Sequence, residues 1–263
     1  MSSIDRVARI ATRSGPVAVA FSDGEWAGIH DPYADRLTLT GERFGMDVEF
    51  LAPCEPRVIL GMAHNGPGDR HLPPQAFTKS ARTAVGPGEA ILLDSAAGIV
   101  NAEGELAVVM RRSSRHLAAD DVAEAILGFT VANDVTAIEQ VSLDSMMTQA
   151  KNGDGFTPLG PWIHRGLDPH DVAIDVIVNG ERRVSGSTSD LSYGVVELIV
   201  YLTSIMTLGP GDVVLTGAPG TMTPISDGDE VSIALDGLGV LTNPVASLRK
   251  DPMAMHEAKV ALR

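Results

Sequence analysis

Short apolar runs separated by turn residues recur along most of the chain, and this pattern predicts a fold built mainly of strands. Asn179-Gly180 lies between two such runs and is typical of a two-residue hairpin turn. The predicted strands cover residues 7–12, 17–21, 90–93, 107–110, 129–133, 172–178, 182–185, 213–216 and 231–235.

Two segments have apolar residues at helical spacing instead. Residues 120–127 predict a short helix, with Gly128 as its stop signal. Residues 193–208 predict the longest helix, and Asp190 and Ser192 are the candidate N-terminal caps. Few helices among many strands indicate an α+β fold that is mostly β.

A segment with the character of a linker, which begins at residue 52, suggests two units. Residues 1–52 predict a small N-terminal β domain, and residues 53–263 predict a larger second domain. The segment from Ala52 to Pro56 holds two prolines and is interpreted as the linker between them.

Composition narrows the classes of function. The chain has 263 residues, of which 44% are hydrophobic, so it can bury a large core. Its net charge of −14 argues against nucleic acid and anionic membranes as partners. Cys54 is the single cysteine, so we expect no intramolecular disulfide and a reducing, cytoplasmic location. No signal peptide and no transmembrane helix are expected.

The strongest chemical signal is the pair Glu103 and Glu105, at the start of an apolar run. Residues two apart in a strand share one face, so the two carboxylates repel each other unless a cation lies between them. Asp134 follows another apolar run and can add a third oxygen ligand. Such a set suits Mg²⁺ or Mn²⁺, and also Ca²⁺. The simpler alternative is a polar strand end in water, with Asp134 as a turn cap.

Several segments, taken in order, resemble the fumarylacetoacetate hydrolase family. The resemblance covers roughly residues 58–246 and includes Lys151. The segments are AEGELAVV (102–109), GFTVANDVTA (128–137), FTPLGPW (156–162), VNGE (178–181), GSTSD (186–190), LGPGDVVLTG (208–217) and GLGVLTNPV (237–245).

The resemblance implies a mixed β-sandwich roll, usually assembled as a homodimer. It implies that Glu103, Glu105 and Asp134 bind the metal and that Lys151 orients the substrate or moves a proton. It also implies that three further residues bind the substrate, namely Thr188, Thr216 and Asp154.

The chain departs from the family pattern at two places. The segment that usually forms a lid helix is short here and contains several glycines and prolines, so a regular helix is not expected. His64 in this segment is a candidate general base, with Asp69 or His71 as partner; the alternative is a loop histidine without a role. Ile138 replaces an arginine of many members, and Ala218 replaces a threonine, which favours a substrate with a less acidic or bulkier apolar end than oxaloacetate.

Three functions remain open from the sequence. The first is a metal-dependent hydrolase or lyase that cleaves a C–C bond of a 1,3-dioxo or 2-oxo acid, such as an acylpyruvate, in aromatic-compound breakdown. The second is an isomerase or decarboxylase of an unsaturated 2-oxo diacid, which needs no activated water. The third is a non-catalytic relative that keeps the metal as a structural element.

Overall fold

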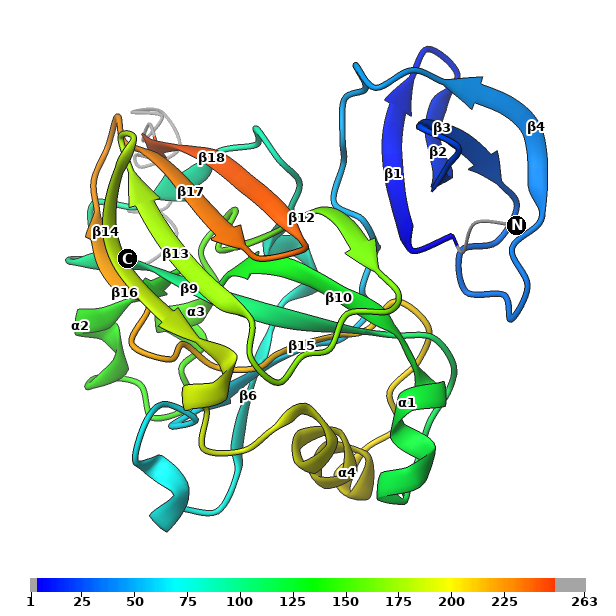
Figure 1. Cartoon of the computed structure of the whole chain (residues 1–263). Helices are drawn as coiled ribbons and strands as arrows, with labels where there is room; N and C mark the ends of the chain where they lie inside the picture. The colour runs from blue at the N-terminus through cyan, green and yellow to red at the C-terminus, as the bar shows by residue number, and fades with distance from the viewer. Residues whose placement is uncertain (1–3, 249–263) are drawn as a thin grey trace, which may run out of the picture.

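The computed structural model describes residues 4–248 and is rich in strands, as the sequence predicts (Figure 1). The strands are β1 (Arg6–Thr12), β2 (Gly15–Ser22), β3 (Glu25–Ile29), β4 (Leu39–Phe44), β5 (Ile59–Ala63), β6 (Gln75–Lys79), β7 (Ala84–Val85), β8 (Ile91–Leu93), β9 (Val100–Met110), β10 (Ile126–Asn133), β11 (Thr136–Ala137), β12 (Thr157–His164), β13 (Ala173–Val178), β14 (Glu181–Ser187), β15 (Val213–Leu215), β16 (Met222–Ile225), β17 (Glu230–Leu235) and β18 (Gly239–Ser247). The α-helices are α1 (Val122–Ala125), α2 (Ile138–Val141), α3 (Thr148–Lys151) and α4 (Val195–Ile205). The 3-10 turns are η1 (Asp69–His71), η2 (Ala81–Thr83), η3 (Ala119–Asp121) and η4 (Thr188–Asp190).

The N-terminal strands form an antiparallel meander at one side of the molecule (Figure 1). Its first strand, β1, also pairs with β12 of the larger part, with Arg6 opposite His164 and Val7 opposite Ile163. The strand order of the larger sheet therefore runs continuously from β4 through β1 to β12, β10, β9, β15, β5 and β6.

Strand β9 is the centre of this sheet and is buried on both faces. Leu106 and Val108 point into the core that lies between the two sheets, whereas Ala107 and Val109 point into a second core on the opposite face. A strand covered on both sides is expected to be apolar throughout, and the end of β9 from Leu106 to Met110 is. The two glutamates that precede this apolar part of the strand are therefore exceptions that need a local explanation.

A second sheet, in the order β14-β13-β17-β18-β8, covers the side of β9 and β10 that carries the first core. Ile174 and Val176 of β13 and Ile233 of β17 belong to that core, together with Leu106 and Val108. The hairpin of β13 and β14 turns at Asn179 and Gly180, both with positive φ, as the sequence predicts. Two packed sheets with few helices confirm the predicted mostly-β α+β fold.

The two predicted helices are shorter than expected. The first, α1, ends at Ala125, and Gly128 lies inside β10 instead of stopping the helix. Gly128 is needed there because a β-carbon would collide with the carbonyl of His164 on the neighbouring strand. The prediction failed because strand pairing outweighed helical spacing at residues 126 and 127.

The longer helix α4 begins at Val195, and neither predicted cap residue caps it. Gly194 is the N-cap, and its N–H donates to the Glu197 carboxylate at 3.1 Å. Asp190 belongs to η4, and the Ser192 hydroxyl donates to the carbonyl of Gly66. Between residues 4 and 248, no helix has the length and apolar character needed to cross a membrane.

Candidate active site

Three carboxylates meet where β9 and β10 pair. Glu103 and Glu105 lie on the same face of β9, and Asp134 directly follows β10. The antiparallel register places Glu105 opposite Ala132, and the N–H of Asp134 donates to the carbonyl of Glu103 at 2.9 Å. One oxygen from each of the three side chains lies within 4.8 Å of the others. The structure thus brings together the three residues predicted to bind metal.

Two lysines contact this cluster. The Nζ of Lys151, at the end of α3, donates to Oδ2 of Asp134 at 2.6 Å and to Oε2 of Glu103 at 3.0 Å. The Nζ of Lys79, at the end of β6, donates to the other oxygen, Oδ1 of Asp134, and to the carbonyl of Phe156. The side chain of Lys79 is fully buried, so its charge depends on these partners.

The three carboxylates differ in their electrostatic environments. Burial raises the pKa of Glu105 well above its usual value, and the nearby Asp134 adds to the shift. Burial also raises the pKa of Glu103, against the opposing effect of Lys151. Burial alone would raise the pKa of Asp134, but the two ammonium groups of Lys151 and Lys79 hold it below its usual value. The cluster therefore contains one firmly ionised carboxylate and two that resist ionisation.

The donor set fits a hard divalent cation. Glu105 accepts one hydrogen bond, 2.7 Å from the N–H of Gly217, and within residues 4–248 it forms no ion pair. A buried carboxylate of this kind gains most from a cation, since the cation replaces the lost hydration. Oxygen ligands in a site of this kind suit Mg²⁺, Mn²⁺ or Ca²⁺. Glu103, Glu105 and Asp134 are therefore the residues that would hold a metal ion.

The protonation of Lys151 is set by the same carboxylates. Burial by itself lowers the pKa of Lys151, but the attraction of Asp134, Glu103 and Glu105 outweighs this effect and raises the pKa above its usual value. Lys151 is therefore an ammonium ion in the protein without metal. A divalent cation on the same three oxygens would oppose this attraction and favour loss of the proton.

The residues of the cluster line a cavity of about 360 Å³. His64 and Asp69 line it, so the structure brings the predicted general base and one of its candidate partners to the same cavity as Lys151. His71 lies outside the lining, and its ring contacts the carbonyl of Gly68. The rest of the lining is mainly apolar. It consists of Met62, Ala63, Phe77, Ile138, Val141, Met147, Ala218 and Met222, together with Asn65, Gly66, Thr136 and Gly220.

The segment around His64 has no lid helix; its one helical element is the 3-10 turn η1, as the sequence predicts. Asn65 holds this segment in place: its side-chain amide donates to the carbonyls of Thr216 and Tyr193, and its Oδ1 accepts from the N–H of Tyr193. His64 itself is exposed and has a φ of 53°, the left-handed region. No hydrogen bond joins its ring to a carboxylate among the described residues.

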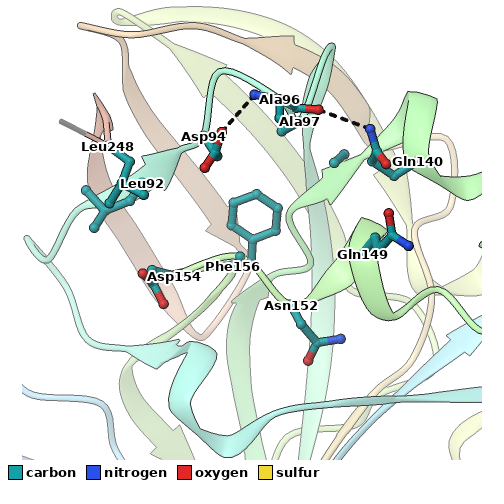
Figure 2. A pocket seen from close by; sticks show the side chains of 12 residues that line it. Leu92, Asp94, Ala96, Ala97, Gln140, Gln149, Asn152, Asp154, Phe156 and Leu248 are labelled. Atoms are coloured by element: carbon teal, nitrogen blue, oxygen red, sulfur yellow. Dashed lines mark hydrogen bonds between the residues drawn. The ribbon is translucent and has the colours of Figure 1, made fainter. Parts of the chain in front are cut away.

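The three residues predicted to bind substrate lie outside the lining of this cavity. The Thr188 hydroxyl donates to the carbonyl of Pro169 and accepts from the N–H of Val172, and this residue lines another cavity. The Thr216 hydroxyl donates to the carbonyl of Leu106 at 2.9 Å, so it joins β15 to β9. Asp154 lies in a separate cavity beside Phe156 and Asn152 (Figure 2).

Sequence reasoning missed two residues of the site. Lys79 is distant from the acidic motif along the chain, but Phe77 and Lys79 are two apart in β6 and point to the same buried side. This alternation was the available signal, because a lysine on the apolar face of a strand needs a buried partner. Asn65 carries no such signal, since its partners lie more than 120 residues away.

Comparison with known proteins agrees with the fold. The family model "Fumarylacetoacetate (FAA) hydrolase C-terminal" matches residues 59–246. Protein Rv2993c of Mycobacterium tuberculosis is 36% identical over 259 residues, which are 91% of this chain and 97% of that protein.

Named activities occur among the relatives. The structure of 5-carboxymethyl-2-hydroxymuconate delta-isomerase from Mycobacterium smegmatis is 39% identical, with a TM-score of 0.87, and the match covers 92% of this chain and all of that one. The 4-hydroxyphenylacetate degradation bifunctional isomerase/decarboxylase of Salmonella dublin is 32% identical over 222 residues, 80% of this chain and 48% of that protein. The family match spans well over half of the chain, and the ligand cluster and both lysines lie within it. This chain therefore belongs to the fumarylacetoacetate hydrolase family.

Proposed function

We propose that this protein is a divalent-metal-dependent enzyme that isomerises or decarboxylates a 2-oxo or 1,3-dioxo acid through its enolate. The observation that carries the proposal is the buried group of Glu103, Glu105 and Asp134, with Lys151 in contact with two of them. A divalent cation bound there would draw electrons from the substrate oxygens and stabilise the negative charge of an enolate.

The residues of the chain supply the rest of the chemistry. In such a reaction a proton leaves or joins a carbon next to the ketone. Lys151 lines the cavity and carries its proton on Nζ beside the carboxylates, so we assign it to hold or move that proton. Lys79 lies behind Asp134 and does not line the cavity; its role is to hold the Asp134 carboxylate in position.

The preference for isomerisation or decarboxylation over hydrolysis rests on the segment around His64. Hydrolysis needs a base that is oriented by a partner and activates water. The exposed His64 has no hydrogen-bonded carboxylate among residues 4–248, and the Asp69 carboxylate accepts instead from the N–H of Gly66 at 3.2 Å. The names of the Mycobacterium smegmatis and Salmonella dublin relatives support the same preference.

Hydrolytic C–C cleavage is the second candidate. Its support is that His64 and Asp69 both line the cavity of the acidic cluster. A bound substrate could bring the two side chains together, since catalytic hydrogen bonds often tighten only in the complex.

Mass spectrometry in H₂¹⁸O distinguishes the two candidates. Acylpyruvates, oxaloacetate and unsaturated 2-oxo acids would be incubated with the protein and Mg²⁺ or Mn²⁺, while NMR in D₂O follows proton exchange at the carbon beside the ketone. We expect metal-dependent exchange, with a shifted double bond or loss of CO₂ and no ¹⁸O in a newly formed carboxylate. A labelled carboxylate would establish hydrolysis instead.

Matched variants test whether the activity depends on the acidic cluster. Glu105→Gln should abolish metal-dependent exchange, whereas Glu124→Gln should leave it unchanged, because Glu124 is exposed and pairs with Arg112 at the surface. Absence of exchange and of turnover across the panel, in metal-loaded wild-type protein, would refute the proposed function.

A further inference from the structure

The lining of the cavity combines charged and apolar side chains. The acidic cluster and Lys151 belong to it, and the Nζ of Lys151 lies 4.8 Å from the centre of the Phe77 ring. Further apolar side chains come from the segment that contains α2 and α3 and from β16, namely Ile138, Val141, Met147 and Met222.

The charges of the cavity oppose a second acidic group on the substrate. Four carboxylates line it, and Lys151 is the one ammonium or guanidinium group in its lining. Lys151 is already engaged by Glu103 and Asp134. Arg70, in the segment that follows His64, donates hydrogen bonds to the Glu197 carboxylate and to the carbonyl of Ser192. A second substrate carboxylate would therefore lose its hydration without gaining an ammonium or guanidinium partner.

We propose that this site selects 2-oxo acids whose far end is apolar over diacids of the same length, and that Ile138 is the residue that sets this preference. The inference rests on the proposed function, because the 2-oxo acid end is taken to bind at the acidic cluster. The far end then contacts the apolar side chains of the lining.

Ile138 is suited to this role by its position. It is the first residue of α2 and follows β11, whose pairing with β9 fixes Ala137 opposite Val100. The N–H of Ile138 donates to the carbonyl of Ile99 at 2.9 Å, so its backbone is anchored to the strand that leads to Glu103. The side chain is half-buried and lines the cavity. Met147 and Met222 lie in the same wall, and flexible methionines can adjust to chains of different shape.

Binding of unreactive analogues tests the preference independently of turnover. N-alkyl oxamates resemble a 2-oxo acid, and their length can be increased one methylene at a time. Calorimetry with Mn²⁺-loaded protein should show tighter binding by about fourfold for each added methylene while the chain stays within the cavity. N-(carboxyalkyl) oxamates of equal length should bind at least about tenfold more weakly. Equal or tighter binding of the acidic series would overturn the proposal.

Variants test whether Ile138 sets the preference for an apolar far end. Ile138→Arg should weaken the alkyl series and strengthen the carboxyalkyl series, which reverses the order of affinities. Leu143→Arg is the matched control: Leu143 lies in the same segment, is 75% exposed and does not line the cavity, so it should leave both series unchanged. Met222→Arg, at a rim position that is 46% exposed, repeats the test if Ile138→Arg does not fold.

The outcomes separate the two proposals. Selective binding of the alkyl series without turnover of any 2-oxo acid would support the selectivity and refute the proposed reaction. Turnover of diacids and apolar-ended acids with equal kcat/KM would support the reaction and refute the selectivity. An Ile138→Arg variant that folds and keeps the wild-type order of affinities would refute the assignment of Ile138.

Discussion

The N–H of Gly217, in the loop after β15, donates a 2.7 Å hydrogen bond to Oε2 of Glu105 in the middle of β9. Glu105 is the carboxylate of the cluster that has no lysine bonded to it. The direction of its side chain therefore depends on a backbone group of the loop after β15. Gly217 has a φ of 104°, and a β-carbon there would lie 2.9 Å from the side chain of Asn65.

Replacing Gly217 should weaken metal binding. Gly217→Ala forces a side chain into a strained backbone conformation and against Asn65, so the N–H moves away from Glu105. We expect a loss of about 1–3 kcal/mol in the free energy of unfolding and metal affinity about 10–100-fold weaker. Calorimetric titration with Mn²⁺ measures the affinity. Gly220→Ala is the control, because Gly220 also has positive φ but has open space around it, and its metal affinity should match wild type.

Lys79 should be needed for stability. Lys79→Met removes one of the two ammonium groups on Asp134 and leaves the carbonyl of Phe156 without this donor. Breaking a buried ion pair costs about 3–5 kcal/mol, and we expect a loss of that order in urea unfolding of the metal-free protein. Added Mn²⁺ should restore part of it. Arg82→Met, at an exposed position, should be neutral; equal stability of the two variants would contradict the structural role of Lys79.

Stability without metal should fall as pH rises. Burial raises the pKa of Glu105, with a further contribution from Asp134, so the folded state holds this proton to a higher pH than the unfolded state does. A group whose pKa is higher in the folded state than in the unfolded state contributes stability at pH values below its unfolded pKa. This contribution is lost as pH rises towards the folded-state pKa. Asp134 and Lys79, whose pKa values are both lowered in the folded state, act in the opposite direction. Asp134 is ionised in both states above about pH 5.

Urea unfolding of metal-free protein at about pH 5 and about pH 8 measures this effect. Glu105→Gln should have the smaller difference between the two pH values, because its amide does not titrate. Metal affinity of wild type should rise over the same range, since binding displaces the proton. A pH dependence identical in wild type and Glu105→Gln would assign the effect to other groups.

Cys54 should not react with thiol reagents in the folded protein. It is 1% exposed, and burial raises the pKa of its thiol to about 12, so the reactive thiolate is scarce at neutral pH. A colorimetric disulfide reagent should label it only after unfolding, with one equivalent per chain in urea. Fast labelling of native protein would show that the segment around residue 54 opens.

Local patterns explain why much of the site could be predicted. Glu103 and Glu105 are adjacent on one strand face, and the apolar run before Asp134 is itself the neighbouring strand, so spacing along the sequence corresponds to closeness in space. Lys151 was identified through resemblance alone, because a lysine in a polar segment looks like a surface residue. It is nevertheless buried, with 5% of its surface exposed, since α3 contacts β11 and β6.

The remaining features depend on contacts between distant segments. Lys79 contacts Asp134 although β9, β15 and β5 lie between β6 and β10 in the order of the large sheet. No spacing along the sequence indicates this contact. Gly128 resembles a helix stop until the carbonyl of His164 is placed beside it. Thr188 and Thr216 resemble pocket residues in sequence, yet their hydroxyls are bonded to backbone carbonyls, an arrangement that only the fold reveals.

The pairing of β1 with β12 limits how this chain can be dissected. Trp162 of β12 contacts Trp26 and Phe50, with ring centroids 6.3 and 5.8 Å away, and Arg6 lies over its ring. A fragment that begins at residue 53 would lose all three contacts and leave an unprotected edge on a strand that also pairs with β10. Exposed strand edges recruit other chains. Truncation at the linker would thus be expected to yield an aggregation-prone fragment instead of a minimal enzyme.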